Sequence, residues 1–126
     1  MTENLLNHLP MINSRQLRSD GRGVRVPFSV LLESDDQSLK LDCYRILRVL
    51  PRKRLVCSGK FAGQDVVVKF FMDSKRSARH SLREEKGLRA LQAAGIKTPA
   101  LLDKCALKPD RIPVLVFQKI DAESVN

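Results

Sequence analysis

The sequence of 126 residues contains no tryptophan, one tyrosine and five phenylalanines. So few aromatic rings leave little material for the stacking platforms that bind single-stranded nucleic acids. No apolar run approaches the roughly 20 residues that a membrane-spanning helix requires. The N-terminus has no basic stretch leading into an apolar core, so we expect no signal peptide. These absences favour a cytoplasmic protein with a single hydrophobic core.

Cysteine is also scarce. Cys43, Cys57 and Cys105 are odd in number and lack the spacing of a metal site. We therefore expect reduced thiols in the core or half-buried, with no metal ligand among them.

Positive charge is what the sequence has in excess. Its 23 lysines and arginines outnumber 14 acids and give a formal net charge of +9. The cations form clusters, at 51–54 (PRKR) and 75–79 (KRSAR), rather than one tail. Such charge favours an anionic partner, such as nucleotide phosphates, nucleic acid, a lipid surface or a phosphorylated glycan. A solvated surface is the simpler explanation of either cluster taken alone.

The hydrophobic pattern predicts an α+β fold in which an antiparallel sheet of about five or six strands packs against one main helix. Alternating apolar residues and turn signals predict strands at 24–32, 42–50, 55–61, 65–72, 100–108 and 112–120. Pro27 lacks an N–H, which places the first strand at an edge of the sheet. Residues 1–23 are polar and end in SDGRG, which is typical of a turn or linker.

One helix is predicted over residues 75–94. Asp73 or Ser74 can accept a backbone N–H at its start, and Gly95 can end it in the left-handed conformation. Gly87, inside the helix, costs about 1 kcal/mol relative to alanine. This cost suggests a packing requirement at that position.

Lys69 lies in the apolar strand DVVVKFFM, where alternation places it on one face with Val67 and Phe71. A lysine there can extend to solvent from an open face. If it is buried, its ammonium needs a counter-charge or an anionic ligand, because desolvating it alone costs several kcal/mol.

Two glutamates on the following helix could supply that counter-charge. Glu84 shares a helical stripe with Leu88 and Leu91, at i+4 and i+7, so we expect it to face the sheet. Glu85 has Arg89 at i+4, which suits a solvent-exposed ion pair. The sequence therefore predicts a pair between Lys69 and Glu84, with Glu85 facing outward.

A strand of the form V-x-x-K followed by a helix with an inward glutamate resembles the small lobe of protein-kinase-like phosphotransferases. More narrowly, RILRVLPRKRLVCSGKFAGQDVVVKFF with REEKGLRALQAAGIKTP is similar to the bacterial lipopolysaccharide kinase family. That family phosphorylates heptose or Kdo sugars of the inner core and includes an InaA or toluene-tolerance-like branch. The resemblance covers roughly residues 42–125. We therefore expect residues 1–40 to be an N-terminal extension with an edge strand, and residues 41–126 to be a kinase-like small lobe.

The resemblance implies that ATP binds this lobe. Lys69 would hold the α- and β-phosphates, and Glu84 would orient Lys69. Val67 would contact the adenine, and Phe117 would be the gatekeeper. The backbone from Gln118 to Ile120 would meet the adenine edge.

Two features depart from the kinase pattern. The glycine-rich phosphate loop is absent, and the turn LPRKR stands in its place. The resemblance implies that Arg52, Lys53 and Arg54 cover the nucleotide there, although they could equally face a phosphorylated glycan acceptor. No His-Arg-Asp-like loop or Asp-Phe-Gly motif is present, so the catalytic base and the Mg²⁺ ligands are expected in a larger lobe that this chain lacks.

The resemblance implies the nucleotide-binding lobe of a kinase for a lipopolysaccharide sugar or related acceptor, not competent by itself. An anionic glycolipid acceptor would bring the protein to the inner-membrane surface. Apolar residues around Phe117 and Ile120 would face the missing lobe and favour self-association. Two alternatives are a basic nucleic-acid-binding domain, which the lack of a motif disfavours, and a pseudokinase-type interaction module.

Overall fold

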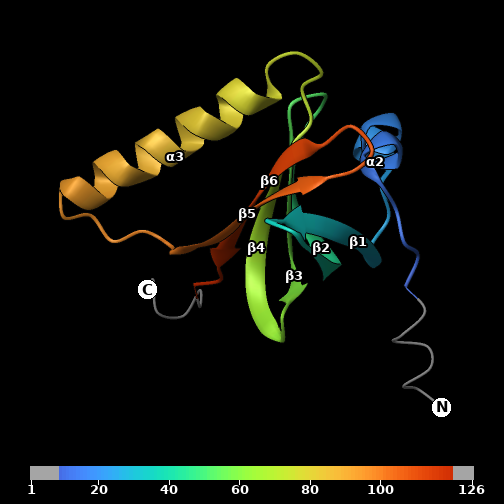
Figure 1. The fold of residues 1–126 in the computed structure, drawn as a ribbon, viewed down its shortest axis with the longest axis horizontal. Coiled ribbons are helices and arrows are strands. Elements are labelled where there is room, and N and C mark those ends of the chain that lie inside the picture. Colours follow the sequence, from blue (N-terminus) through green and yellow to red (C-terminus); the bar gives the residue numbers. More distant parts are fainter. Residues whose placement is uncertain (1–8, 121–126) are drawn as a thin grey trace.

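The computed structural model describes residues 9–120. Its elements are α2 (Ser14–Asp20), the 3₁₀ turn η1 (Gly21–Gly23), β1 (Phe28–Ser34), β2 (Gln37–Leu50), β3 (Arg54–Phe61), β4 (Gln64–Phe71), α3 (Ser77–Ala93), β5 (Leu101–Leu107) and β6 (Ile112–Gln118). The strands form one antiparallel sheet in the order β1-β2-β3-β4-β6-β5, which closes into a barrel (Figure 1). The predicted α+β class and antiparallel pairing are confirmed, whereas closure of the sheet was not predicted.

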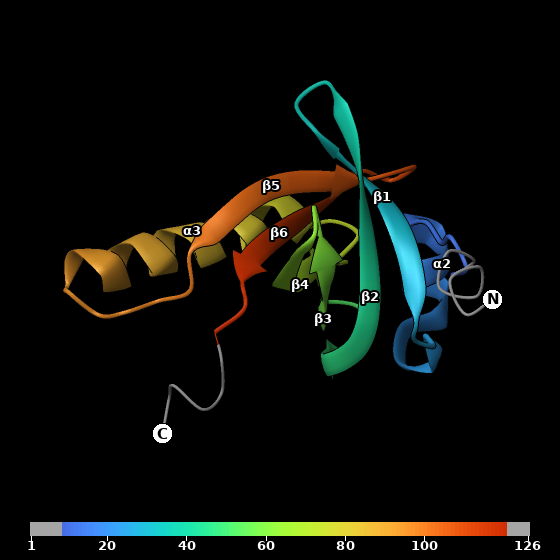
Figure 2. The same cartoon turned by 90° about the horizontal axis from the view of Figure 1, so that it is seen from below.

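Strand β1 lies between β2 and β5 and is not at an edge, so the prediction made from Pro27 is wrong. Pro27 immediately precedes the strand, and its missing N–H therefore lies outside the ladder. β1 pairs with β2 along its length, but with β5 only at Leu32 and Glu33. Near the start of β1, Ser29 forms a parallel bridge with Met11, so the N-terminal segment covers that part of the strand (Figure 2).

Helix α2 occupies part of the polar segment that the sequence suggested was a linker. Asn13 and Gln16 form a reciprocal capping box at its start. Leu17 is 1% exposed and belongs to the barrel core, and Arg18 forms a 3.1 Å ion pair with Asp110. One buried leucine in a short helix gives no hydrophobic periodicity, which explains why the helix was not predicted.

Strand β2 is the longest strand and contains two register shifts, near residues 43–45 and 46–48. Such bulges bend a strand and allow a sheet to coil into a barrel. Gly59 of β3 lies against the first of them, where a Cβ atom would collide with the carbonyl oxygen of Asp42. The boundary that we expected after residue 40, between an N-terminal extension and a kinase-like lobe, falls inside this strand.

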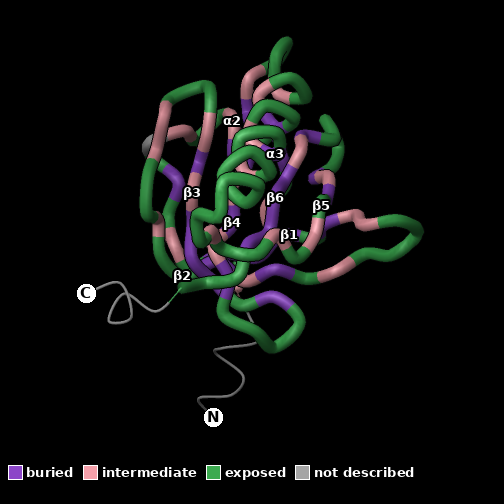
Figure 3. Tube along the Cα trace, turned by 90° about the vertical axis from the view of Figure 1, so that its left-hand side faces the viewer, coloured by how far each residue is buried: buried purple, intermediate pink, exposed green. Residues whose placement is uncertain are grey.

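Helix α3 lies on the outside of the barrel, on the opposite side from α2 (Figures 1 and 2). Val66, Val68 and Phe70 of β4 point into the barrel core. A second, smaller cluster of Phe71, Leu115 and Phe117, with Leu88 and Leu101 packed against it, lies under the helix. Most of the helix remains exposed (Figure 3).

The start of α3 differs from the prediction. Asp73 accepts the N–H groups of Lys75 and Arg76 at 2.9 and 2.7 Å. These bonds stabilise the turn before the helix and lower the pKa of Asp73. The helix itself begins at Ser77, while Gly95 follows its end with a positive φ of 79°, as expected.

Gly87 meets no packing requirement, so that prediction is wrong. A Cβ atom built on Gly87 would have no neighbour within 4 Å. The glycine therefore carries its helix-propensity cost with no compensating contact inside the described part of the chain.

We expect Gly87→Ala to raise the free energy of unfolding by about 0.5–1 kcal/mol, because alanine loses less backbone entropy in a helix. Gly95→Ala is the matched control and should lower it by a similar amount, since its left-handed conformation disfavours a side chain. Urea denaturation measures both. A destabilised Gly87→Ala variant would contradict the open surroundings of this position.

The cysteines are free and buried in the structure. A hydrogen bond with Cys57, together with burial, raises the pKa of the Cys43 thiol far above its usual range. Burial raises the pKa of Cys105 to about 12. Since the thiolate is the reactive form, these two thiols should be inert in the folded protein.

Iodoacetamide at pH 8 should therefore leave Cys43 and Cys105 unmodified in the native protein and alkylate them after unfolding in urea. Mass spectrometry of tryptic peptides measures both states. Rapid alkylation of Cys105 without denaturant would show that the β5 region opens readily.

Candidate functional site

The outer face of β4 carries Val67, Lys69 and Phe71, as the alternation predicted, and α3 lies over this face. The Lys69 side chain is only 26% exposed. Its Nζ atom lies 5.3 Å from the centre of the Phe117 ring on β6, within cation–π range. Lys69 is therefore a half-buried cation on an apolar wall and not a lysine that reaches freely into solvent.

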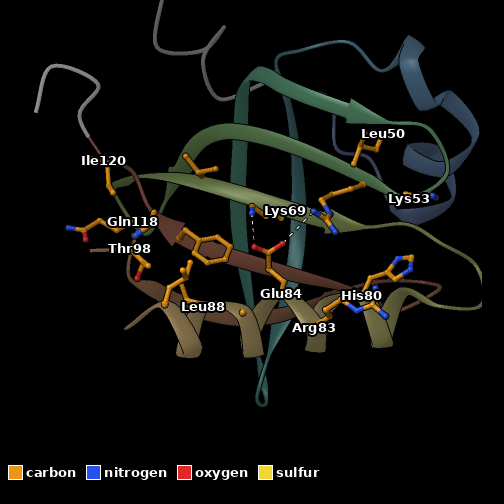
Figure 4. A pocket seen from close by; sticks show the side chains of 16 residues that line it. Leu50, Lys53, Lys69, His80, Arg83, Glu84, Leu88, Thr98, Gln118 and Ile120 are labelled. Carbon is orange, nitrogen blue, oxygen red and sulfur yellow. Dashed lines mark hydrogen bonds and ion pairs between the residues drawn. The ribbon is translucent and has the colours of Figure 1, made fainter. Parts of the chain in front are cut away.

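Glu84 of α3 neutralises Lys69 and contacts a second cation. Lys69 Nζ donates to Glu84 Oε2 at 2.9 Å, and Arg54 lies 3.4 Å from Glu84 Oε1 (Figure 4). The predicted pairing of Lys69 with Glu84 is confirmed. The trio retains one net positive charge, because one carboxylate serves two cations.

Arg54 begins β3, directly after the turn at 51–53. Its guanidinium carbon lies 5.0 Å from the centre of the Phe71 ring. Its Nε atom is buried and has no hydrogen-bond partner within the described residues. Arg54 is thus held in place by packing on Phe71 and by its ion pair with Glu84.

Glu85 is buried, which corrects the expectation that it faces solvent. The residue is 9% exposed, and its Oε2 atom lies 3.3 Å from Lys104 and 3.8 Å from Arg89. Lys104 is on β5, so Glu85 turns toward β5 while its neighbour Glu84 turns toward β4. Two consecutive residues face the barrel because the helix crosses more than one strand.

A cleft of about 930 Å³ lies between α3, the outer face of the barrel and the turn at 50–54 (Figure 4). The candidate residues from the sequence that line it are Lys53, Arg54, Val67, Lys69, Glu84, Phe117, Gln118 and Ile120. Arg52 is not among the lining residues; it is exposed in the turn, with a positive φ of 62°. The structure therefore gathers all the candidates but one.

Further lining residues were not predicted from the sequence. His80 lies at i−4 from Glu84, Arg83 lies at i+3 from His80, and both extend the polar part of the cleft along α3. That helical spacing was the signal that could have identified them. Leu91 and Pro99 add apolar surface toward the end where Gln118 and Ile120 lie. The cleft thus has a cationic end and a mainly apolar end.

Comparison with protein-family models, curated proteins and solved structures finds no match to this chain. Within residues 9–120, no three His, Cys, Asp or Glu side chains are grouped so that they could hold a metal ion. Glu84, the one carboxylate that lines the cleft in this part of the chain, is engaged by Lys69 and Arg54. None of the helices within residues 9–120 is long and apolar enough to cross a membrane.

Substitutions of Lys69 and Glu84, which form a charged trio with Arg54, should lower the free energy of unfolding by different amounts. Lys69→Met leaves Glu84 paired with Arg54, so the free energy of unfolding should fall by about 1 kcal/mol or less. Glu84→Gln leaves two half-buried cations without a carboxylate and should cost about 2 kcal/mol.

Glu85→Gln is the comparison for these variants. Its partners Lys104 and Arg89 are 59% and 74% exposed and can return to water, so this change should cost about 0–1 kcal/mol. Urea denaturation of the three variants ranks them. A larger cost for Glu85→Gln than for Glu84→Gln would contradict a central role for Glu84.

Proposed function

We propose that this chain is the nucleotide-binding lobe of an ATP-dependent phosphotransferase, similar to the bacterial lipopolysaccharide kinases. The observation that carries this proposal is the 2.9 Å ion pair between Lys69 on β4 and Glu84 on the helix that follows. In protein kinases, a strand lysine held by a helix glutamate binds the α- and β-phosphates of ATP. Arg54, at the start of β3, reaches the other oxygen of the same glutamate at 3.4 Å.

The order of the elements supports the same proposal. The β2–β3 hairpin precedes the lysine-bearing β4, and α3 then leads to β5 and β6. This is the succession of hairpin, lysine strand, helix and two strands on which the resemblance rests. The additional strand β1 closes the sheet between β2 and β5, and β1 contributes no residue to the cleft.

In the proposed complex, the phosphates lie against Lys69, and Lys53 and Arg54 supply charge where a glycine-rich loop would supply backbone amides. The adenine lies at the apolar end, against Val67 and Phe117. Such a bipartite cleft fits a ligand with one anionic and one planar apolar part.

The strand end at 118–120 meets the adenine edge. The N–H of Gln118 donates to Ala100 O at 2.8 Å, and that of Lys119 lies 3.4 Å from Asp65 O. Both groups are therefore engaged within the protein. In our proposal, the N–H of Ile120 makes the hydrogen bond to adenine.

Phosphoryl transfer also requires a base and Mg²⁺ ligands, and a second lobe would supply them. We infer an anionic sugar or glycolipid as the acceptor, and hence a cytoplasmic protein that works at the inner-membrane surface. Phe117 is only 5% exposed, which corrects the expectation that it belongs to an exposed surface facing the second lobe. The exposed side chains of Leu91, Ile96 and Ile120 would face that lobe, or another copy of this chain in its absence.

An acyl-phosphate derivative of ATP, which acylates lysines beside the bound phosphates, tests the proposal directly. Lys69 should be acylated, and excess ATP should suppress the reaction with a Kd of about 1 mM, since half a cleft supplies half the contacts. Lys60, which is 52% exposed and does not line the cleft, is the internal control and should react without regard to ATP. Acylation of Lys69 that ATP does not suppress would overturn the nucleotide site.

A further inference from the structure

The cationic end of the cleft carries more charge than the pair with Glu84 requires. Lys53, Arg54 and Lys69 lie on the barrel side, and Arg83 lies on the helix side. Glu84 is the one acid that lines the cleft within residues 9–120. Four cations and one carboxylate leave this end with a net charge of +3, which suits a ligand with several negative charges.

Two of the lining groups on the helix have no part in the Lys69 pair. His80 and Arg83 project from the first half of α3, at the end of the cleft where Lys53 lies and away from Thr98 and Gln118 (Figure 4). Within the described residues, no carboxylate lies within ion-pair distance of Arg83. His80 and Arg83 thus lie on the side of the cleft where Lys53 lies (Figure 4), and no side-chain hydrogen bond or ion pair joins either of them to another residue in the described range 9–120.

The opposite wall offers a donor of the same kind. Arg54 lines this wall and uses one terminal guanidinium nitrogen, Nη1, for Glu84. Guanidinium groups bind phosphoryl oxygens through paired N–H donors. An anion between the two walls could thus accept hydrogen bonds from Arg54 on one side and from Arg83 and His80 on the other.

We propose that this end of the cleft is a second phosphoryl-binding subsite, formed by Arg54 on the barrel and by Arg83 and His80 on α3. The subsite rests on the proposed function for its neighbour, since Lys69 would hold the inner phosphates of the nucleotide. The phosphoryl group it takes is either the terminal phosphate of that nucleotide or a phosphate carried by the acceptor sugar.

The test compares Arg83→Ala with Arg79→Ala. Both variants lose one positive charge from α3, but Arg79 does not line the cleft. NMR titrations of the 126-residue chain give the Kd for ATP, for AMP, for inorganic tripolyphosphate, and for glucose 6-phosphate in the presence of ADP.

If the subsite holds the terminal phosphate, Arg83→Ala should weaken ATP and tripolyphosphate binding about tenfold and leave AMP unchanged. If it holds an acceptor phosphate, Arg83→Ala should abolish glucose 6-phosphate binding and leave ATP unchanged. Arg79→Ala should change neither result. Equal behaviour of the two variants toward every ligand would overturn the subsite.

The same titrations separate this subsite from the proposed function. Lys69→Met should weaken ATP binding if the nucleotide site is correct. Tripolyphosphate binding that depends on Arg83, in a chain that does not bind ATP, would support the subsite and refute the nucleotide-binding function. Nucleotide binding that depends on Lys69 and not on Arg83, with no phosphosugar binding, would support the nucleotide-binding function and refute the subsite.

Discussion

The half-buried charge of Lys69 is the constraint on which the outer side of this protein depends. An ammonium on a wall formed by Val67 and Phe117 is costly unless a carboxylate reaches it. Glu84 can do so only if α3 lies across the barrel with that residue turned toward β4. The ion pair therefore requires this rotation of the helix, and the space left between helix and barrel is the cleft.

Much of this arrangement could be predicted from the sequence because it depends on local patterns. Alternating apolar residues identified the strands, and the spacing of Glu84 from Leu88 identified the inward face of the helix. Val67, Lys69 and Phe117 were assigned to one site because the resemblance placed them there, and the structure brings them to one cleft. That geometry leaves the ATP-binding role itself a proposal.

The remaining features depend on relations between distant residues. Closure of the barrel requires β1 to pair with β5 through Leu32 and Glu33, and no local pattern encodes a pairing of so few residues. Pro27 suggested an edge strand because a proline inside a strand lacks the N–H that a neighbouring strand would bind. The sequence alone did not establish that Pro27 lies just outside the strand. Glu85 was misplaced because a helix crossing two strands buries a wider stripe than a helix over one.

The two hydrophobic clusters have a consequence for how the molecule can open. The barrel cluster contains side chains from α2 and from all six strands but none from α3, which packs only on the small outer cluster. Separating α3 from the barrel would break the ion pairs and this outer cluster and leave the barrel core intact. We therefore expect partial opening at the cleft to require less free energy than global unfolding. A ligand bound in the cleft would raise the free energy of this partial opening, because the ligand would join the helix to the barrel.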